Sequence, residues 1–303
     1  MRIVFFGTPE FAAHSLKKIV GEGFNVVAVV TAPDKPAGRG RQLKSSEVKI
    51  MAENLNLPIL QPTNLKAPDF IEQLQSLDAD LGVVIAFRML PKSVWSAPKL
   101  GTINLHASIL PNYRGAAPIQ HAIIQGETKT GVSTFFLKHE IDTGDLIDQK
   151  EVNMDAFETG GTLHDKLMVV GSELMIQSLK KIEKQGNSVE TFPQVYNDTV
   201  KTAPKLNRDF CKIEPTEGVN FNFNKIRGLS PYPGAWINSV WGEMKIFESE
   251  IAQENPNYVD HSTVFIANKK LYIKCIDGFI EVKSLQLQGK SRMDAKSFLN
   301  GLK

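Results

Sequence analysis

An amide and an imidazole stand two residues apart in the most distinctive segment of the sequence, residues 101–125. They belong to Asn104 and His106, which lie in a short apolar stretch typical of a β-strand. Side chains at positions i and i+2 of a strand project to the same side of a sheet, so the two polar groups should face one space. An amide N–H can stabilise a developing oxyanion, and an imidazole can transfer a proton. The pair therefore suits attack on a carbonyl carbon.

Carboxylates that could orient the imidazole are present in residues 138–145. This segment follows a predicted strand and contains Glu140, Asp142 and Asp145. Gly144 permits a tight turn that would bring one of these carboxylates beside the ring. The residue types do not choose among the three acids. The alternative interpretation is structural, because carboxylates in turns commonly serve the turn itself, and an Asn and a His two residues apart are often structural as well.

Short apolar runs alternate with helical patterns through the first half of the chain, and these elements must position the polar groups. The predicted strands are 3–6, 26–30, 81–86, 102–106, 132–137 and 146–152, and the helical patterns cover 11–20 and 162–182. Strands that are apolar throughout and interleaved with helices favour a mostly parallel sheet with helices on both faces. The sequence therefore predicts an α/β, Rossmann-like domain over residues 1–186. Ligand crevices in such sheets lie at the carboxyl ends of the strands, where Asn104 and His106 are found.

The pattern changes near Gly186. Residues 187–206 are polar, contain two prolines and show no period, so we interpret them as a linker. Short β-type runs follow, and Asp277-Gly278 between two of them is typical of a hairpin turn. A small β-barrel domain of the OB-like kind is therefore predicted over residues 207–303.

The chain resembles the folate-dependent formyltransferase family and, within it, the methionyl-tRNA formyltransferases. The resemblance runs from FFGTPEFA at the start through PDKPAGRG, SILPNYRGAAPIQ and EIDTGD to LSPYPGAW and QGKSRM near the end, so it covers essentially the whole chain. The family has an Asn-x-His strand motif and a later Asp-x-Gly-Asp loop at its reaction centre. The resemblance assigns these positions to Asn104, His106 and Asp142.

The resemblance also implies the substrates. The donor would be 10-formyltetrahydrofolate, and the acceptor would be the α-amino group of methionine on initiator tRNA, in translation initiation. Asn104 would hold the formyl oxygen, His106 would assist proton transfer to the departing folate nitrogen, and Asp142 would orient His106. The residues expected to contact the folate are Phe87, Arg88, Met89, Leu90, Ser108, Ile109, Leu110 and Pro111. Arg88 departs from the family pattern, which usually has glycine there.

A basic loop, residues 33–49, is expected to contact the tRNA. Its five lysines and arginines outnumber its two acids, and by composition alone it could be an ordinary solvated loop. In the family it resembles, the corresponding insertion grips the acceptor arm of the tRNA. We expect Arg39, Arg41 and Lys44 to bind phosphates in a salt-sensitive manner. The resemblance also implies tRNA docking by the C-terminal domain, over which basic residues are spread.

Composition bounds the remaining possibilities. The chain has 303 residues, of which 42% are hydrophobic and 22% charged, as is typical of a folded globular protein with one or two domains. No apolar run approaches the roughly 20 residues that span a bilayer, so no membrane partner is expected. No His or Cys ligand spacing predicts a metal site. Two sparse cysteines suit the reducing cytoplasm, and we expect a monomer.

Three alternative functions each fit the sequence less well. A purine-pathway or sugar-amine formyltransferase keeps the reaction centre but makes no use of the basic loop. A non-catalytic RNA-binding protein would use the basic regions and leave Asn104 and His106 idle. A nicotinamide dehydrogenase needs a glycine-rich fingerprint, and both Gly7-Thr8-Pro9 and Gly38-x-Gly40 lack its third glycine.

Overall fold

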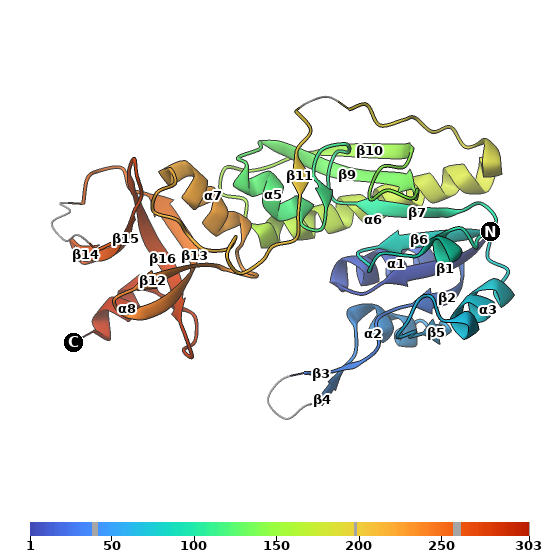
Figure 1. Cartoon of the computed structure of the whole chain (residues 1–303), viewed down its shortest axis with the longest axis horizontal. Helices are drawn as coiled ribbons and strands as arrows, with labels where there is room; N and C mark the ends of the chain where they lie inside the picture. The colour runs from blue at the N-terminus through green and yellow to red at the C-terminus, as the bar shows by residue number, and fades with distance from the viewer. Residues whose placement is uncertain (38–41, 197–198, 257–261, 303) are drawn as a thin grey trace. The chain divides into compact units, whose positions relative to one another are not determined.

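The structure is a computed structural model, which describes the chain except residues 38–41, 197–198, 257–261 and 303 (Figure 1). The chain forms two compact units. The first contains Met1–Arg114, Gly131–Val152 and Asp165–Lys201, and the second contains Gly115–Thr130, Asn153–His164 and Thr202–Lys303. Both units therefore draw on several stretches of sequence. The predicted boundaries, with a linker over 187–206, stay predictions.

A seven-stranded sheet forms the centre of the first unit, in the order β10-β9-β7-β6-β1-β2-β5. Its strands are β1 (Arg2–Gly7), β2 (Asn25–Val30), β5 (Ile59–Leu60), β6 (Leu81–Ile85), β7 (Thr102–His106), β9 (Lys129–Phe136) and β10 (Leu146–Asn153). The five strands from β5 to β7 pair in parallel, and β9 runs antiparallel to β7. Every residue of β6 is buried, as expected for a strand covered on both faces. The predicted Rossmann-like sheet is confirmed.

Helices pack on both faces of this sheet. They are α1 (Glu10–Gly21), α2 (Glu47–Asn54), α3 (Pro68–Ser76), α4 (Lys92–Trp95) and α6 (Gly160–Gln185). On one face, Phe70 of α3 and Val94 of α4 are buried in a hydrophobic cluster with Val84 of β6. On the other face, a Cβ at Gly171 of α6 would lie 3.1 Å from the Leu105 side chain of β7, so glycine lets the helix approach the strand closely.

The second unit is built on an antiparallel sheet in the order β12-β13-β16-β15-β14, with β17 paired to β16. Its strands are β12 (Ala235–Ser239), β13 (Gly242–Ile251), β14 (Val264–Ala267), β15 (Lys270–Lys274), β16 (Phe279–Leu287) and β17 (Met293–Asp294), and its helices are α5 (Pro118–Ile124), α7 (Val219–Gly228) and α8 (Ala295–Asn300). The predicted β-rich C-terminal domain is confirmed, as an antiparallel half-barrel.

Cys211 and Cys275 are free thiols buried in the core of the second unit, and burial raises the pKa of Cys275 to about 11.

Two short pairs of strands and a 3-10 helix complete the fold. β3 (Lys35–Ala37) and β4 (Gln42–Lys44) form a hairpin that projects from the first unit (Figure 1). β8 (Arg114–Gly115) pairs with β11 (Thr202–Ala203), and a 3-10 helix, η1, covers Gly186–Ser188. The hairpin belongs to the predicted basic loop, and η1 directly follows the long helix α6.

Candidate active site

Strand β7 presents Asn104 and His106 on the same face of the sheet, as the alternation of a strand requires. In the sheet register, Asn104 lies beside Val84 of β6, and His106 lies beside Ser133 of β9. His106 is buried, whereas Asn104 is partly exposed. No described residue hydrogen-bonds to the Asn104 side chain. Its amide N–H groups can therefore serve a bound oxyanion.

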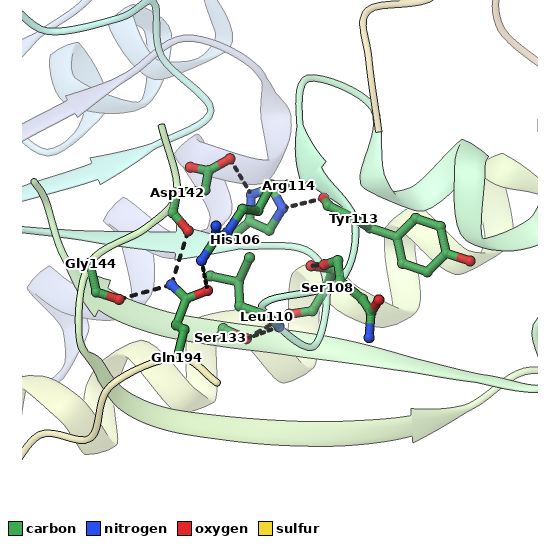
Figure 2. Close-up of polar contacts among 10 residues, drawn as sticks. His106, Ser108, Leu110, Tyr113, Arg114, Ser133, Asp142, Gly144 and Gln194 are labelled. Atoms are coloured by element: carbon green, nitrogen blue, oxygen red, sulfur yellow. Dashed lines mark hydrogen bonds and ion pairs between the residues drawn. The ribbon is translucent and has the colours of Figure 1, made fainter. Parts of the chain in front are cut away.

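The His106 ring is held at both of its nitrogen atoms (Figure 2). Nε2 lies 2.8 Å from the carbonyl oxygen of Tyr113, and Nδ1 lies 3.7 Å from a carboxylate oxygen of Asp142. A carbonyl oxygen only accepts hydrogen bonds, so Nε2 carries a proton. The Asp142 contact is longer than a direct hydrogen bond and acts through charge. Together the two contacts determine which way the ring faces.

Asp142 is the acid that lies beside His106. Its side chain is almost fully buried, with 10% of its surface exposed. Glu140 is exposed to solvent, and Asp145 forms an ion pair with Lys138 at 2.9 Å. The structure thus separates three acids that their residue types could not distinguish.

The turn that carries Asp142 has an unusual backbone. Asp142 has a φ of 54°, in the left-handed region that favours glycine. A Cβ at Gly144 would lie 1.5 Å from the carbonyl oxygen of Phe136, so a larger residue cannot fit without moving the turn. Tyr113, on the other side of the His106 ring, has a φ of 61°. Both protein partners of the ring therefore lie at strained backbone positions, which tend to occur at functional sites.

One further side chain contacts this turn and a second supports the first, and the sequence reasoning missed both. Gln194 is buried and donates hydrogen bonds to the carbonyls of Asp142 and Gly144, while Arg114 donates to its side-chain oxygen. Gln194 belongs to the segment interpreted as a linker, where a single polar residue gives no signal. Arg114 belongs to the motif SILPNYRGAAPIQ, and that membership was the one available pointer to it.

The loop that follows β7 is tied to the neighbouring strands. Ser133 of β9 donates its hydroxyl to the Ser108 carbonyl at 2.6 Å and accepts from the Leu110 N–H at 3.1 Å. Gln149 of β10 donates to the Leu110 carbonyl at 2.9 Å. These bonds give the loop Ser108–Pro111 a defined conformation. Its predicted contact with folate stays a prediction.

Phe87 and Arg88 line a cavity of about 470 Å³. The other residues that line it are Thr8, Ala32, Pro33, Lys35 and Thr63. The cavity lies where the chain leaves the carboxyl ends of β1, β2 and β6. Of the other two predicted folate residues in this loop, Met89 is 73% exposed and Leu90 is buried. The structure thus assigns unequal exposure to the four neighbouring residues.

Arg88 is anchored to the wall of this cavity. Its guanidinium donates to the carbonyls of Pro62 and Thr63, the latter at 3.0 Å, and lies 5.7 Å from the centre of the Phe87 ring. These contacts hold the side chain against the loop that follows β5. Arg88, which departs from the pattern expected from the resemblance, is therefore an oriented cation.

The basic loop is only partly described. Arg39 and Arg41 lie outside the described residues, and Lys44 is exposed at the end of β4. At the base of the loop, Lys49 forms an ion pair with Asp34, and this hydrogen-bonded contact holds the pKa of Asp34 below its usual range. The two ends of the loop are therefore joined by the ion pair between Asp34 and Lys49. The contacts of the loop with tRNA stay predictions.

Two other kinds of feature are absent from the described part of the chain. No three or more His, Cys, Asp or Glu side chains gather there in a group that could hold a metal ion. No helix there is both long and apolar enough to cross a bilayer.

Comparison with known families assigns the class of protein. The profile of the Formyl transferase family matches residues 1–179, and the profile of the formyl transferase C-terminal domain matches residues 205–303. The chain belongs to the formyl transferase family.

Within this family, similar relatives carry one particular name, methionyl-tRNA formyltransferase. The protein of that name from Flavobacterium johnsoniae is 49% identical over 306 residues, which cover 100% of this chain and 96% of the relative. The one from Flavobacterium psychrophilum is 50% identical over 307 residues, with the same coverage of 100% and 96%. The similarity therefore extends through both units.

Solved structures share the fold at much lower identity. A variant of HypX from Aquifex aeolicus superposes with a TM-score of 0.69 at 16% identity, covering 100% of this chain and 47% of that protein. The N-formyltransferase from Helicobacter canadensis, solved with folinic acid and dTDP-3-aminofucose, gives a TM-score of 0.68 at 21% identity, covering 92% and 97%. At these identities the likeness concerns the fold alone.

Proposed function

We propose that this protein transfers the formyl group of 10-formyltetrahydrofolate to the α-amino group of methionyl initiator tRNA, for translation initiation. One observation carries the proposal: an imidazole held between the Asp142 carboxylate and the Tyr113 carbonyl, two residues from the Asn104 amide. The nature of the acceptor is supported by relatives of 49% and 50% identity that are named methionyl-tRNA formyltransferase.

The reaction exchanges one C–N bond for another. The neutral amine of methionine attacks the formyl carbon, and the formyl oxygen becomes an oxyanion on a tetrahedral carbon. Asn104 donates an amide N–H to that oxygen, and a donor of this kind typically contributes about 10²–10³ in rate. The tetrahedral carbon then expels the folate nitrogen, which takes up one proton while the amine loses one.

His106 serves the proton transfer between these two nitrogen atoms. Its Nε2 carries a proton, which is donated to the Tyr113 carbonyl at 2.8 Å in the structure. When a bound substrate replaces this carbonyl, the ring takes up the proton that the amine loses and passes one proton to the folate nitrogen, so its own protonation is the same before and after the reaction. Asp142 keeps the ring oriented during this exchange, from 3.7 Å away.

The folate pterin is assigned to the region of Phe87–Leu90 and Ser108–Pro111. The cavity beside Phe87 has a volume of about 470 Å³, within the roughly 300–1,000 Å³ of small-molecule sites. Phe87 supplies an aromatic face, and Arg88 is an oriented donor at the same wall. A fold neighbour, HypX, has been solved with tetrahydrofolic acid, which agrees with this donor class.

The tRNA is assigned to the loop 33–49 and to the second unit. Lys44 is exposed, and it is proposed to contact the phosphate backbone together with Arg39 and Arg41. The sequence carries a formal charge of only +2, so local patches rather than overall charge must attract the tRNA.

We further propose that the protein acts as a monomer in the cytoplasm, where charged tRNA is found.

A product assay with competing acceptors tests this function. The protein is mixed with 10-formyltetrahydrofolate and, in separate reactions, with charged initiator methionyl-tRNA, an amino-sugar nucleotide or glycinamide ribonucleotide. The expected product is formylmethionine, recovered after hydrolysis of the tRNA ester and identified by mass spectrometry. Formylation of either small amine without formylation of the tRNA would overturn the proposed acceptor.

A further inference from the structure

Gln194 makes three hydrogen bonds through one buried side chain (Figure 2). Its Nε2 donates to the carbonyl of Asp142 at 2.9 Å and to the carbonyl of Gly144 at 2.8 Å. Its Oε1 accepts from Nη2 of Arg114. Backbone carbonyls only accept and a guanidinium only donates, so these partners determine which way the amide points. Both N–H groups of the amide are directed at the turn that carries Asp142.

Arg114 connects Gln194 to the other side of the His106 ring. The guanidinium lies 4.2 Å from the centre of the Tyr196 ring, which holds it from the same segment as Gln194. Arg114 directly follows Tyr113, whose carbonyl accepts the Nε2 proton of His106 at 2.8 Å. Both protein partners of the imidazole are therefore tied to the Gln194 side chain, one through the turn and one through Arg114.

Attachment of the segment to the sheet does not depend on Gln194. Two residues earlier, the N–H of Phe192 donates to the Leu146 carbonyl at 3.0 Å, and the N–H of Leu146 donates to the Phe192 carbonyl at 2.8 Å. This bridge holds the segment to β10 by itself. What Gln194 adds is support for a turn in which Asp142 has a φ of 54°, a conformation that persists only where the surroundings enforce it.

We propose that Gln194 is a positioning residue for formyl transfer. It holds the Asp142 turn, and through Arg114 the Tyr113 carbonyl, in the places from which both orient the His106 ring before the substrate binds. The inference rests on the proposed function, because its kinetic readout is the transfer reaction. Without the amide the turn relaxes and Asp142 moves away from Nδ1, so the chemical step slows while substrate binding is retained.

The experiment compares Gln194→Met, which keeps the length of the side chain but has no hydrogen-bond donor, with the wild-type protein. We expect kcat for formylation of methionyl-tRNA to fall about 10- to 100-fold, as for loss of an aligning contact, with KM for both substrates changed less than about twofold. Val195→Ala is the matched control, because Val195 is the next residue and is 80% exposed. Its kcat should equal that of the wild-type protein.

A double-mutant cycle separates positioning from general damage. If Gln194 acts through Asp142, adding Gln194→Met to Asp142→Asn should lower kcat by less than about threefold further, because coupled residues are not additive. A full multiplication of the two losses would overturn the inference, as would a wild-type kcat in Gln194→Met. Gln194→Glu, which keeps an acceptor for Arg114 but lacks both donors, should behave like Gln194→Met and gives a second variant if methionine prevents folding.

A second readout does not depend on the reaction. The ring nitrogen signals of His106 in a ¹⁵N-histidine NMR spectrum should move in Gln194→Met in the same direction as in Asp142→Asn, and should stay unchanged in Val195→Ala. Unchanged His106 signals in Gln194→Met would refute the positioning role. A wild-type protein that fails to formylate methionyl-tRNA would refute the proposed function instead, and the NMR comparison would still decide the role of Gln194.

Discussion

The two ring nitrogens of His106 face groups of different kinds, and this arrangement determines its chemistry. The Tyr113 carbonyl at 2.8 Å requires a proton on Nε2, whereas the Asp142 carboxylate faces Nδ1 from 3.7 Å. A neutral replacement for Asp142 would keep the shape of the site and remove the charge that orients the ring. We therefore attribute the role of Asp142 to positioning of His106 rather than to contact with the substrate.

The substitution Gly144→Ala should displace Asp142 and lower both stability and activity. The new Cβ would lie 1.5 Å from the Phe136 carbonyl oxygen, so the turn that carries Asp142 must move. We expect the free energy of unfolding to fall by about 2–4 kcal/mol, the upper range for single substitutions, and kcat to fall at least tenfold. Urea denaturation and formylation kinetics measure the two effects.

Gly21→Ala provides the matched control for this substitution. Gly21 ends α1, and a Cβ there would meet no atom within 4 Å. Alanine in a helix is favoured over glycine by roughly 0.5–1 kcal/mol, so this variant should be as stable as the wild-type protein or slightly more stable. Equal behaviour of the two alanine variants would contradict the close approach at Gly144.

At the scale of elements, β7 was predictable because its signal is local. The Asn-x-His spacing within an apolar run predicts a strand and a shared face, and both follow from alternation. The choice of Asp142 over its neighbours was not predictable from residue type, because it depends on a left-handed turn. The role of Gln194 could not be predicted for another reason, because its side chain hydrogen-bonds to a turn 52 residues earlier in the chain.

Helix α5 carries a buried histidine that should make the protein sensitive to acid. His121 is 5% exposed, its Nε2 donates to the Pro204 carbonyl at 3.0 Å, and burial lowers its pKa below 6.5. The folded protein therefore binds a proton at His121 less readily than the unfolded chain does. Stability from this residue is present above about pH 6.5 and is lost as the pH falls through and below that value.

The variant His121→Gln removes this titration and keeps a side-chain donor. Between pH 7.5 and pH 5.5, the free energy of unfolding measured in urea should decrease more for the wild-type protein than for the variant. Parallel decreases in both proteins would show that His121 is not the source of the acid sensitivity.

At the scale of the whole molecule, charge must act locally, because the formal net charge is only +2. Lys44→Ala should weaken binding of tRNA and reduce the slope of log affinity against log salt concentration by about 1, as for loss of one phosphate contact. Lys17→Ala is the control, because Lys17 is an exposed lysine of α1 outside the basic loop. Filter binding over a salt series measures both, and an unchanged slope for Lys44→Ala would argue against a phosphate contact.

The organisation into a Rossmann-like sheet and a β-rich C-terminal unit was also predictable. Runs of apolar strands between helices indicate the first, and short strands with a hairpin signal indicate the second. Which residues belong to each compact unit was harder to predict from the sequence. Residues 115–130, which contain α5, belong to the second unit although they precede the predicted linker by some 60 residues. Packing of α5 against α7 depends on contacts far apart in sequence, such as the close approach of Gly228 to Ile124.

The central claim is that Asn104, His106 and Asp142 form the reaction centre for formyl transfer, and the single-turnover rate of Asn104→Ala tests it most directly. With saturating protein, 10-formyltetrahydrofolate and methionyl initiator tRNA, rapid quench measures appearance of formylmethionine in the chemical step. We predict a rate constant reduced by at least about 10²–10³ relative to the wild-type protein, the typical cost of one lost oxyanion donor, whereas Asn25→Ala at the exposed start of β2 leaves it unchanged. A near-normal rate for Asn104→Ala would contradict the account.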